Sequence, residues 1–439
     1  MTAEWEEKSL GDLIDIKHGF AFSGKHIHDE PRGNILLTPG NFAIGGGFKD
    51  DKFKYFDGEV PNEFVLQPGD LLVTMTDLSK QADTLGYPAI LPNHSGRSYL
   101  HNQRLGKIEV KPGADLDERF LFYLLRTREY RNEILASATG TTVKHTSPKR
   151  ILAHRAKVPP LAEQKAIAAV LGALDDKIEL NRRMNATLEA MARALFQSWF
   201  VDFDPVRRNM DKQKNGKNSS ASSAGALAEV DARFPNEFED SELGPIPKGW
   251  KLGKVSDGFN VTMGQSPPGE TYNEDGAGLP FYQGRADFGF RFPKRRVFCT
   301  APTRLAQTGD TLVSVRAPVG DINMADEECC VGRGVAAVRH KSGATSFTYY
   351  AMENFESDFA RFEAEGTVFG SINKQDFSEL TFVIAPEELV AAYERLASPF
   401  DNKIRILDHQ SRTLVAIRDA LLPKLLSGDV RLNQLQSLT

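Results

Sequence analysis

Cationic side chains that could contact a polyanion are concentrated in two short segments of this chain. The first lies between Lys144 and Lys157 and holds five Lys or Arg, two His and no acidic residue. The second lies between Arg285 and Arg296 and holds five Lys or Arg against one Asp. A single basic run of this kind is usually a solvated protein face. Two runs in comparable places favour contacts to the phosphates of a nucleic acid.

Base edges are read by Arg, Lys, Asn, Gln or acidic side chains, while other cations hold phosphates. We expect such side chains to be presented from the loops and strand ends of two variable regions. Surface charges and strand-capping contacts are the competing interpretation for each of them. The candidates for DNA binding are Lys17, His18, Arg97, His101, Arg104, Lys144 and His145 in the first region, and Gln265, Tyr282, Arg285, Arg291, Arg316 and Arg333 in the second.

Patterns expected of a DNA methyltransferase or an ATPase are missing from the sequence. It has no Asn-Pro-Pro-Tyr segment that could present an extruded adenine, no glycine-rich strand-to-helix turn and no GxxxxGK[ST] phosphate loop. The nuclease-like Glu-x-Lys spacing occurs at Glu109 and Glu6, but a pattern this short arises by chance. We therefore expect no catalytic residue and no cofactor in this chain.

Composition places limits on the remaining classes of protein. The net charge of −5 over 439 residues argues against coating of nucleic acid by charge alone. Cys299, Cys329 and Cys330 form no metal-binding spacing, so we expect free thiols and no metal. The sequence shows no run of about 18 apolar residues and no secretory leader, which predicts a cytoplasmic protein.

The elements that must position these side chains are duplicated. Residues from Gly140 to Leu195 recur at a constant offset, without a gap, between Gly366 and Leu421. Matching pairs include Asp175 with Asp401 and Thr187 with Thr413. Such self-similarity indicates two copies of one module. The stretches upstream of the repeat differ, since the one that begins at Trp5 is longer than the one that begins at Trp250.

Each copy ends in a long helix with a narrow apolar seam. Steps of four and three residues from Ile167 trace this seam over more than four heptads. The spacer residues are Ile167, Leu171, Leu174, Ile178, Leu188 and Leu195 in the first helix, and Ile404, Leu407, Leu414 and Leu421 in the second. Pro423 is expected to disturb the last turn of the second helix.

A narrow seam needs a partner helix, and we expect the two copies to pack antiparallel around a pseudo-twofold axis. The first seam would extend about 50 Å at roughly 1.5 Å per residue. This exceeds one turn of B-DNA, about 34 to 36 Å, and would suit a reader of two DNA segments. The same register places Asn181 near Ser411 and Asn185 near Leu407, as a polar layer that fixes pairing. Asparagines turned to solvent or to a third chain are the open alternative.

The variable regions have short alternating or apolar runs bounded by Gly, Pro, Asn and Asp, which is typical of β-rich structure. We expect one helix in each, over 117–136 and 346–362. The predicted fold class is α+β, with two β-rich recognition regions joined by two long antiparallel coiled-coil helices. The predicted divisions are 1–155 (first recognition domain), 156–206 (central helix), 207–245 (flexible linker without secondary structure), 246–382 (second recognition domain) and 383–439 (distal helix).

Several segments resemble a known family. The stretches 159–181, 196–206, 238–250 and 421–430 are similar to the specificity subunit of type I restriction-modification systems. The chain departs from the family pattern at 386–389, where Pro-Glu-Glu-Leu replaces the Pro, Glu and Gln pattern seen at Pro160, Glu163 and Gln164. That difference concerns only the contacts made by the start of the second helix.

The resemblance implies a non-catalytic subunit that reads a bipartite, asymmetric site in double-stranded DNA, with one half for each target recognition domain. It implies docking of two modification (methyltransferase) subunits and two restriction (helicase-nuclease) subunits, with a role in phage defence. S-adenosylmethionine, ATP and Mg²⁺ would be used by these partner subunits. The alternatives are a tandem protein-binding coiled-coil module without DNA specificity and, less in keeping with the missing motifs, a fused enzyme.

Overall fold

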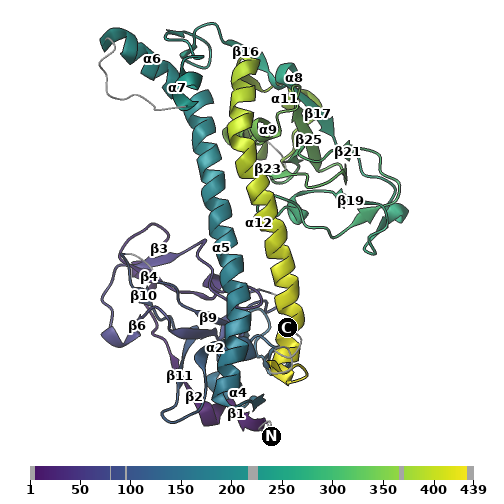
Figure 1. Ribbon diagram of the computed structural model, residues 1–439. Coiled ribbons are helices and arrows are strands. Elements are labelled where there is room, and N and C mark those ends of the chain that lie inside the picture. The colour runs from purple at the N-terminus through teal and green to yellow at the C-terminus, as the bar shows by residue number, and fades with distance from the viewer. Residues whose placement is uncertain (1–4, 80, 94–95, 216–225, 365–369, 433–439) are drawn as a thin grey trace. The chain divides into compact units, whose positions relative to one another are not determined.

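The computed structural model describes residues 5–79, 81–93, 96–215, 226–364 and 370–432. It consists of two units, each with a β-rich region and a portion of both long helices. The first unit comprises residues 1–178 and 412–439, and the second comprises residues 179–411. The long helices are α5 (Leu161–Phe200) and α12 (Glu387–Ser427), and each passes from one unit into the other (Figure 1).

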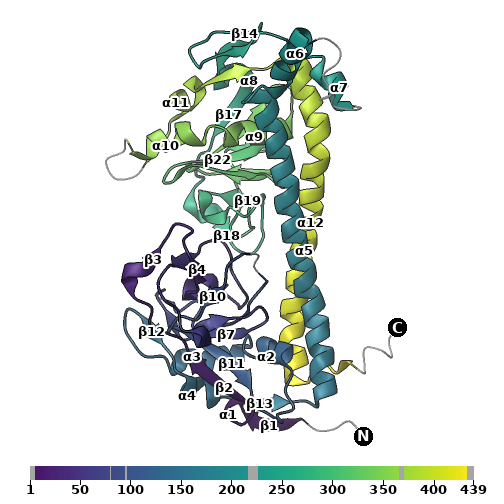
Figure 2. The same cartoon turned by 90° about the vertical axis from the view of Figure 1, so that its left-hand side faces the viewer.

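The first unit contains two larger β-sheets and several short helices (Figure 2). The antiparallel four-stranded sheet has the order β2 (Ile14–His18), β11 (Leu105–Val110), β7 (Leu71–Thr74), β9 (Pro88–Ile90). The five-stranded sheet has the order β3 (Ile27–His28), β5 (Lys54–Phe56), β4 (Asn34–Leu36), β10 (Tyr99–Leu100), β6 (Val65–Leu66). Two-stranded pairs join β1 (Glu6–Ser9) to β13 (Arg155–Val158) and β8 (Thr76–Asp77) to β12 (Lys144–His145). The helices are α1 (Leu10–Leu13), α2 (Glu118–Leu124), α3 (Arg128–Ala136) and α4 (Pro148–Leu152).

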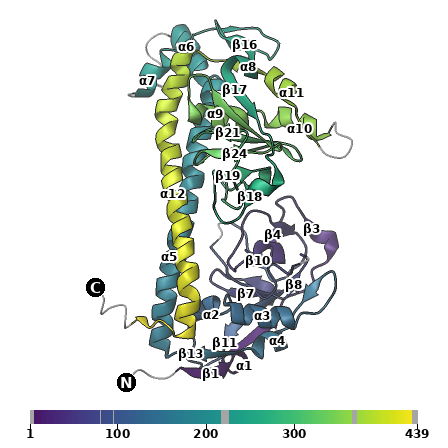
Figure 3. The ribbon, with the colours of Figure 1, turned by 90° about the vertical axis from the view of Figure 1, so that its right-hand side faces the viewer.

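The second unit has the same plan (Figure 3). Its four-stranded sheet has the order β17 (Phe259–Met263), β25 (Val335–His340), β22 (Thr311–Val315), β23 (Val319–Met324). Its five-stranded sheet has the order β18 (Tyr272–Asn273), β20 (Phe298–Cys299), β19 (Leu279–Tyr282), β24 (Cys329–Val331), β21 (Leu305–Ala306). Two-stranded pairs join β14 (Phe238–Glu239) to β15 (Ile246–Pro247) and β16 (Lys251–Lys254) to β26 (Thr381–Ile384). The helices are α6 (Asp204–Asn215), α7 (Ala226–Asp231), α8 (Val255–Gly258), α9 (Thr345–Glu353), α10 (Glu356–Ala364) and α11 (Lys374–Glu379).

The duplication therefore extends through the divergent regions as well as the helices. Leu71 pairs with Ile108 in the first unit as Thr311 pairs with Val338 in the second. One parallel pair occurs in each five-stranded sheet, β4 with β10 and β19 with β24. The predicted α+β class with a pseudo-twofold repeat is confirmed. Similar strand order with dissimilar loops leaves the loops free to carry different surfaces.

The seam of the long helices is confirmed in both units. None of the seam positions is exposed. In the first unit, Ile167 and Leu171 of α5 belong to one buried cluster with Leu422 and Leu425 from the end of α12. In the second unit, Tyr393 near the start of α12 donates a hydrogen bond to the Ala192 carbonyl at 3.0 Å. In each unit the two helices thus run antiparallel.

A polar layer interrupts the seam within the second unit. The Asn181 amide donates to Ser411 Oγ at 3.2 Å and to Gln410 Oε1 at 3.0 Å, which confirms the expected register. Both Asn181 and Asn185 are buried, so the alternative with asparagines facing solvent is wrong. Within the described residues, neither Oδ1 atom has a hydrogen-bond partner. Buried unsatisfied acceptors reduce stability, which is the cost of a layer that specifies one register.

Both expected single helices of the variable regions are broken in two. Residues 117–136 form α2 and α3, and residues 346–362 fall in α9 and α10. In the first unit, the Thr127 side chain caps α3 by accepting from the Tyr130 amide, and Tyr130 OH donates to the Gly86 carbonyl at 3.1 Å. The apolar stripe continues through the break, which is why periodicity alone could not reveal it.

Pro423 does not interrupt α12, which continues to Ser427. The expectation of a disturbed last turn is wrong because Leu422, Leu425 and Leu426 are all buried against the first unit. Burial of three leucines offsets the one backbone hydrogen bond that a proline removes.

The segment 207–245 is not the unstructured linker that its composition predicted. The described part contains most of α6, all of α7 and strand β14, while residues 216–225 lie outside the described residues. Arg208 holds the buried Asp231 with two hydrogen bonds of 2.9 and 2.7 Å. Phe234 packs edge-on to Trp199 with 5.6 Å between ring centroids. These contacts are long-range, so a polar local sequence gave no sign of them.

Replacement of Asn181 and Asn185 by Leu should raise the free energy of unfolding by about 1 to 2 kcal/mol, because the unsatisfied amide oxygens are removed. The gain should come with less specific pairing of the helices. Urea unfolding measures the first effect, and cross-linking of cysteine pairs introduced along α5 and α12 measures the second. Asn402→Leu on the exposed face of α12 is the control. Unchanged stability with a single cross-linking register would contradict the role of this layer.

Candidate nucleic-acid interface

Three loops of the second unit meet at one end of the strands of its four-stranded sheet, and we call this end of the sheet its loop edge. β22 ends at this edge and is followed by Arg316, and β25 starts there just after Arg333. Backbone hydrogen bonds fix the loops to one another. The Val315 amide donates to the Gly334 carbonyl at 2.9 Å, and the Gly334 amide donates to the Gln283 carbonyl at 3.1 Å. This brings the loop after β19, which holds Arg285, to the same place.

These loops enclose a hollow of about 360 Å³. Its lining consists of Gln283, Gly284, Arg285, Ala286, Arg316, Ala317, Arg333 and Gly334. Glycine is required at position 334, because a Cβ there would lie 2.3 Å from the Gln283 carbonyl oxygen. Small residues and close backbone contacts thus leave three arginines as the only charged groups of the lining. We name it the arginine hollow.

The charge of the arginine hollow is largely uncompensated. Arg285 pairs with Asp321 at 2.7 Å, and both side chains are more than two-fifths exposed. In the described part of the chain, Arg316 and Arg333 form no ion pair, and both are exposed. Three guanidinium groups in one hollow repel each other, and of the three only Arg285 is paired with a carboxylate among the described residues. The arrangement suits a phosphate, or a guanine edge contacted by a fork of two N–H donors.

The first unit groups a different set of candidates at the corresponding edge. Met75 follows β7, and its amide donates to the Arg104 carbonyl at 2.9 Å. On the other side, Lys144 and His145 pair with Asp77 and Thr76. His145 Nδ1 lies 3.2 Å from Thr76 Oγ1. Arg104, Lys144 and His145 therefore flank one short segment.

Two further candidates lie on β2 of the same sheet. His18 is exposed at the end of the strand, opposite Gly106. Lys17 is exposed and forms a 2.7 Å ion pair with Glu109 on the neighbouring strand. This hydrogen bond to Glu109 raises the pKa of Lys17. Gln265 of the second unit is likewise exposed just after β17.

Four candidates from the sequence have structural roles instead. His101 and Tyr282 are 2% exposed and Arg291 is 0% exposed, so none of them can meet DNA at the surface. Burial lowers the pKa of His101, whose ring nitrogen lies 3.0 Å from the Leu105 carbonyl oxygen. Arg97 donates to the carbonyl oxygens of Gly33 and Pro31, and so fixes a loop. Side-chain type alone could not separate these residues from exposed ones.

The basic runs are also less available than their composition suggested. Arg295 pairs with Glu327, Arg296 with Asp287, and Arg155 with Glu7. The sequence prediction missed Gln283, whose backbone organises the arginine hollow. The Gly332–Arg333–Gly334 turn was the signal that could have located this site, since two glycines around one arginine permit close backbone packing.

A larger hollow of about 930 Å³ in the second unit has the wrong charge for DNA. Its lining includes four carboxylates against Arg193, the carboxylates being Glu189, Asp321, Glu353 and Glu356. An acidic surface repels phosphate. Among the described residues, we find no group of His, Cys, Asp and Glu that could hold a metal ion and no helix long and apolar enough to cross a membrane.

Comparison with known proteins explains the repeated plan. The family described as type I restriction modification DNA specificity domain matches residues 2–190 and 247–412. The chain belongs to this family. Each matched segment of the specificity subunit contains one β-rich region and much of the long helix that follows it.

Alignments with known relatives cover most of the length of this chain. The type I restriction enzyme HindI specificity subunit of Haemophilus influenzae is 25% identical over 490 aligned residues, covering 98% of this chain and 100% of the relative. The MjaIX specificity subunit of Methanocaldococcus jannaschii is 25% identical over 378 residues, covering 80% and 76%. The crystal structure of an S subunit from M. genitalium shares the fold, with a TM-score of 0.59, 17% identity and 96% coverage of both chains.

Arg291→Ala should lower the free energy of unfolding by about 3 to 5 kcal/mol, because it leaves buried Asp401 without its cation. Arg333→Ala should change it by less than about 0.5 kcal/mol, because that side chain is exposed. Urea unfolding of the two variants beside the unchanged chain measures both. Equal effects would show that the assignment of structural and surface arginines is wrong.

Proposed function

We propose that this chain is the non-catalytic DNA sequence-specificity subunit of a type I restriction-modification complex, and that it reads a bipartite, asymmetric site. The arginine hollow carries this proposal, because it presents a largely uncompensated cationic surface from the loop edge of a recognition domain. The first unit presents Arg104, Lys144 and His145 from the corresponding edge. Two edges with different side chains would read two different half-sites.

The long helices support docking of two copies of one partner. Leu180 and Met191 are each 50% exposed on α5. Their counterparts in the repeat, Ile406 and Ile417, are 61% and 43% exposed on α12. Positions separated by about three helical turns lie on one face of a helix. An exposed apolar pair repeated at the duplication offset suits two identical modification subunits, one for each helix.

The remaining assignments follow from this role. Two restriction subunits complete the assembly, and the partner subunits use S-adenosylmethionine, ATP and Mg²⁺. The assembly works in the cytoplasm, where its DNA substrate is found. A protein-binding module without DNA specificity is the rival proposal, and it requires no salt-dependent affinity for duplex DNA.

The arginine hollow can be tested in the complex assembled with modification subunits. Arg316→Ala combined with Arg333→Ala should weaken binding to duplex DNA and reduce the slope of log affinity against log salt by up to about 1.8, if each arginine holds one phosphate. Fluorescence anisotropy across a salt series measures this. If either arginine reads a base instead, discrimination at one position of the second half-site should fall.

Arg304→Ala is the matched control, because Arg304 is exposed in the same unit but does not line the arginine hollow. The double variant could also keep the affinity, the salt slope and the base discrimination of the unchanged complex. That result would exclude the arginine hollow from the DNA contact.

Exchange of residues 1–155 for another recognition domain of this family should change only one half of the methylated motif. The physical reason is that each β-rich region presents its own loop edge from its own unit. Sequencing of methylated adenines in DNA exposed to the complex before and after the exchange measures the motif. A change in both halves would contradict one half-site for each domain.

A further inference from the structure

The same position of each long helix carries an aspartate that contacts the β-rich region of its own unit. These residues are Asp175 on α5 and Asp401 on α12, which correspond to each other in the repeat. Both aspartates lie outside the apolar seam and outside the loop edges described above. Each accepts hydrogen bonds from a tyrosine hydroxyl and is paired with an arginine of its unit's recognition domain.

In the first unit, Asp175 joins three elements. Its Oδ2 accepts from Tyr123 OH on α2 at 2.9 Å and from Arg126 Nη1 at 2.9 Å. Arg126 also donates from Nε to the Gly45 carbonyl at 2.7 Å. The other oxygen, Oδ1, accepts from Arg418 of α12 at 2.7 Å. Burial opposes ionisation of Asp175, but the nearby Arg126 and Arg418 hold its pKa below the ordinary value.

In the second unit, Asp401 is held in a similar way. Its Oδ1 accepts from Tyr350 OH on α9 at 3.3 Å and lies 3.1 Å from Arg291 Nη1. Arg291 Nη2 donates to the same tyrosine oxygen at 2.8 Å. The Arg291 guanidinium stacks 3.7 Å from the centre of the Tyr349 ring. Glu189 of α5 lies 3.7 Å from Arg291, so both long helices reach this buried cation.

The two tyrosines occupy the same position in corresponding helices, and the two arginines do not occupy corresponding positions. Tyr123 precedes its aspartate by 52 residues and Tyr350 by 51, and each is the sixth residue of its helix. Arg126 lies two residues after the end of α2, whereas Arg291 lies in the loop between β19 and β20, far from α9 in the sequence. Two unrelated positions thus supply the same cation to the same helix aspartate. An arrangement reached twice by different routes indicates a requirement at the aspartate.

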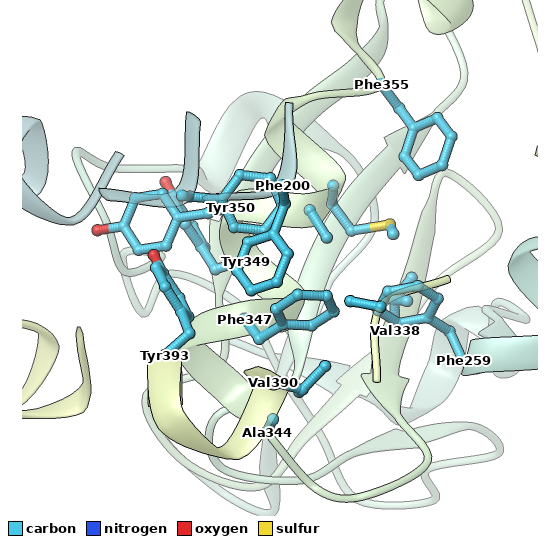
Figure 4. Packing of buried hydrophobic residues seen from close by; sticks show 14 of the residues in the cluster. Phe200, Phe259, Val338, Ala344, Phe347, Tyr349, Tyr350, Phe355, Val390 and Tyr393 are labelled. Atoms are coloured by element: carbon cyan, nitrogen blue, oxygen red, sulfur yellow. The ribbon is translucent and has the colours of Figure 1, made fainter. Parts of the chain in front are cut away.

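A continuous series of packed residues connects Asp401 with the loop edge of the second unit, where the arginine hollow lies. Tyr350 and Tyr349 lie on α9, whose Phe347 lies between Tyr393 of α12 and Val338 of the four-stranded sheet (Figure 4). The Arg291 carbonyl accepts from the Met324 amide on β23 at 2.8 Å, at the edge of the same sheet. Strand β22, which carries Arg316 at its end, pairs with both β23 and β25. A tilt of α9 on the long helix would therefore move the arginine hollow.

We propose that Asp175 and Asp401 are positioning residues, each of which fixes the recognition domain of its own unit on its long helix in a single orientation. This inference rests on the proposed function, since the orientation matters through the DNA half-site that each domain reads. A recognition domain transplanted onto these helices must therefore supply an arginine and a tyrosine hydroxyl that reach the resident aspartate.

The test uses the full chain assembled with its modification subunits. Initial methylation rates are measured on the mapped target and on targets with single base changes in the first or second half. Asp175→Asn should lower discrimination against first-half changes by about tenfold, since a charge-assisted contact is lost, and leave second-half discrimination unchanged. Asp401→Asn should do the reverse. The adjacent Asp176→Asn, which is 69% exposed and forms only a 3.7 Å ion pair, should change neither.

Tyr123→Phe and Tyr350→Phe keep the ring packing and remove only the hydroxyl, so they test the proposal even if an aspartate variant fails to fold. Each should relax discrimination in its own half alone, and by less than the aspartate change. Loss of rate on every target with discrimination intact in both halves would reduce these residues to a structural role and overturn the inference. Loss of discrimination in both halves from one variant would overturn it too. An unaltered complex that methylates no two-part target would instead overturn the proposed function itself.

Discussion

The antiparallel packing of two narrow helical seams is the interaction on which the rest of this protein depends. A stripe of one apolar residue every three or four positions cannot be buried by the helix that carries it. In each unit the stripe of α5 is covered by α12 and by the β-rich region of that unit. The recognition domains are thus attached to a paired scaffold, which a single helix could not provide.

Burial divides the arginines of this chain into two functional groups. Arg126 and Arg291 lie against the long helices, where aromatic rings and aspartates compensate their charge. Arg316 and Arg333 lie on exposed loops, where in the described structure no carboxylate compensates them. A buried cation without a partner would destabilise the fold too much, whereas an exposed cation stays hydrated and can bind an anion from solution. The same type of side chain therefore holds the domain in one place and, in the function we propose, contacts DNA in the other.

Much of the architecture was accessible from the sequence because a duplication is visible without any knowledge of the fold. The seam of Ile167, Leu171 and Leu174 and the contact of Asn181 with Ser411 were predictable from helical spacing and a constant offset. Strands such as β7 and β22 were predictable from apolar runs between turns. Helix breaks near Thr127 were not, because a capping contact leaves the apolar stripe unchanged.

The sequence by itself determined the repeat, the helical seams, the α+β class and the family, because these depend on periodicity and on residues at fixed separations. Only the tertiary structure decided which cations are available. Arg291 and Arg285 belong to one basic run, yet one is buried against Asp401 and the other lines the arginine hollow. Their separation depends on strands that pair across distant parts of the chain. Burial depends on such long-range pairing, and a local pattern of charge therefore does not predict it.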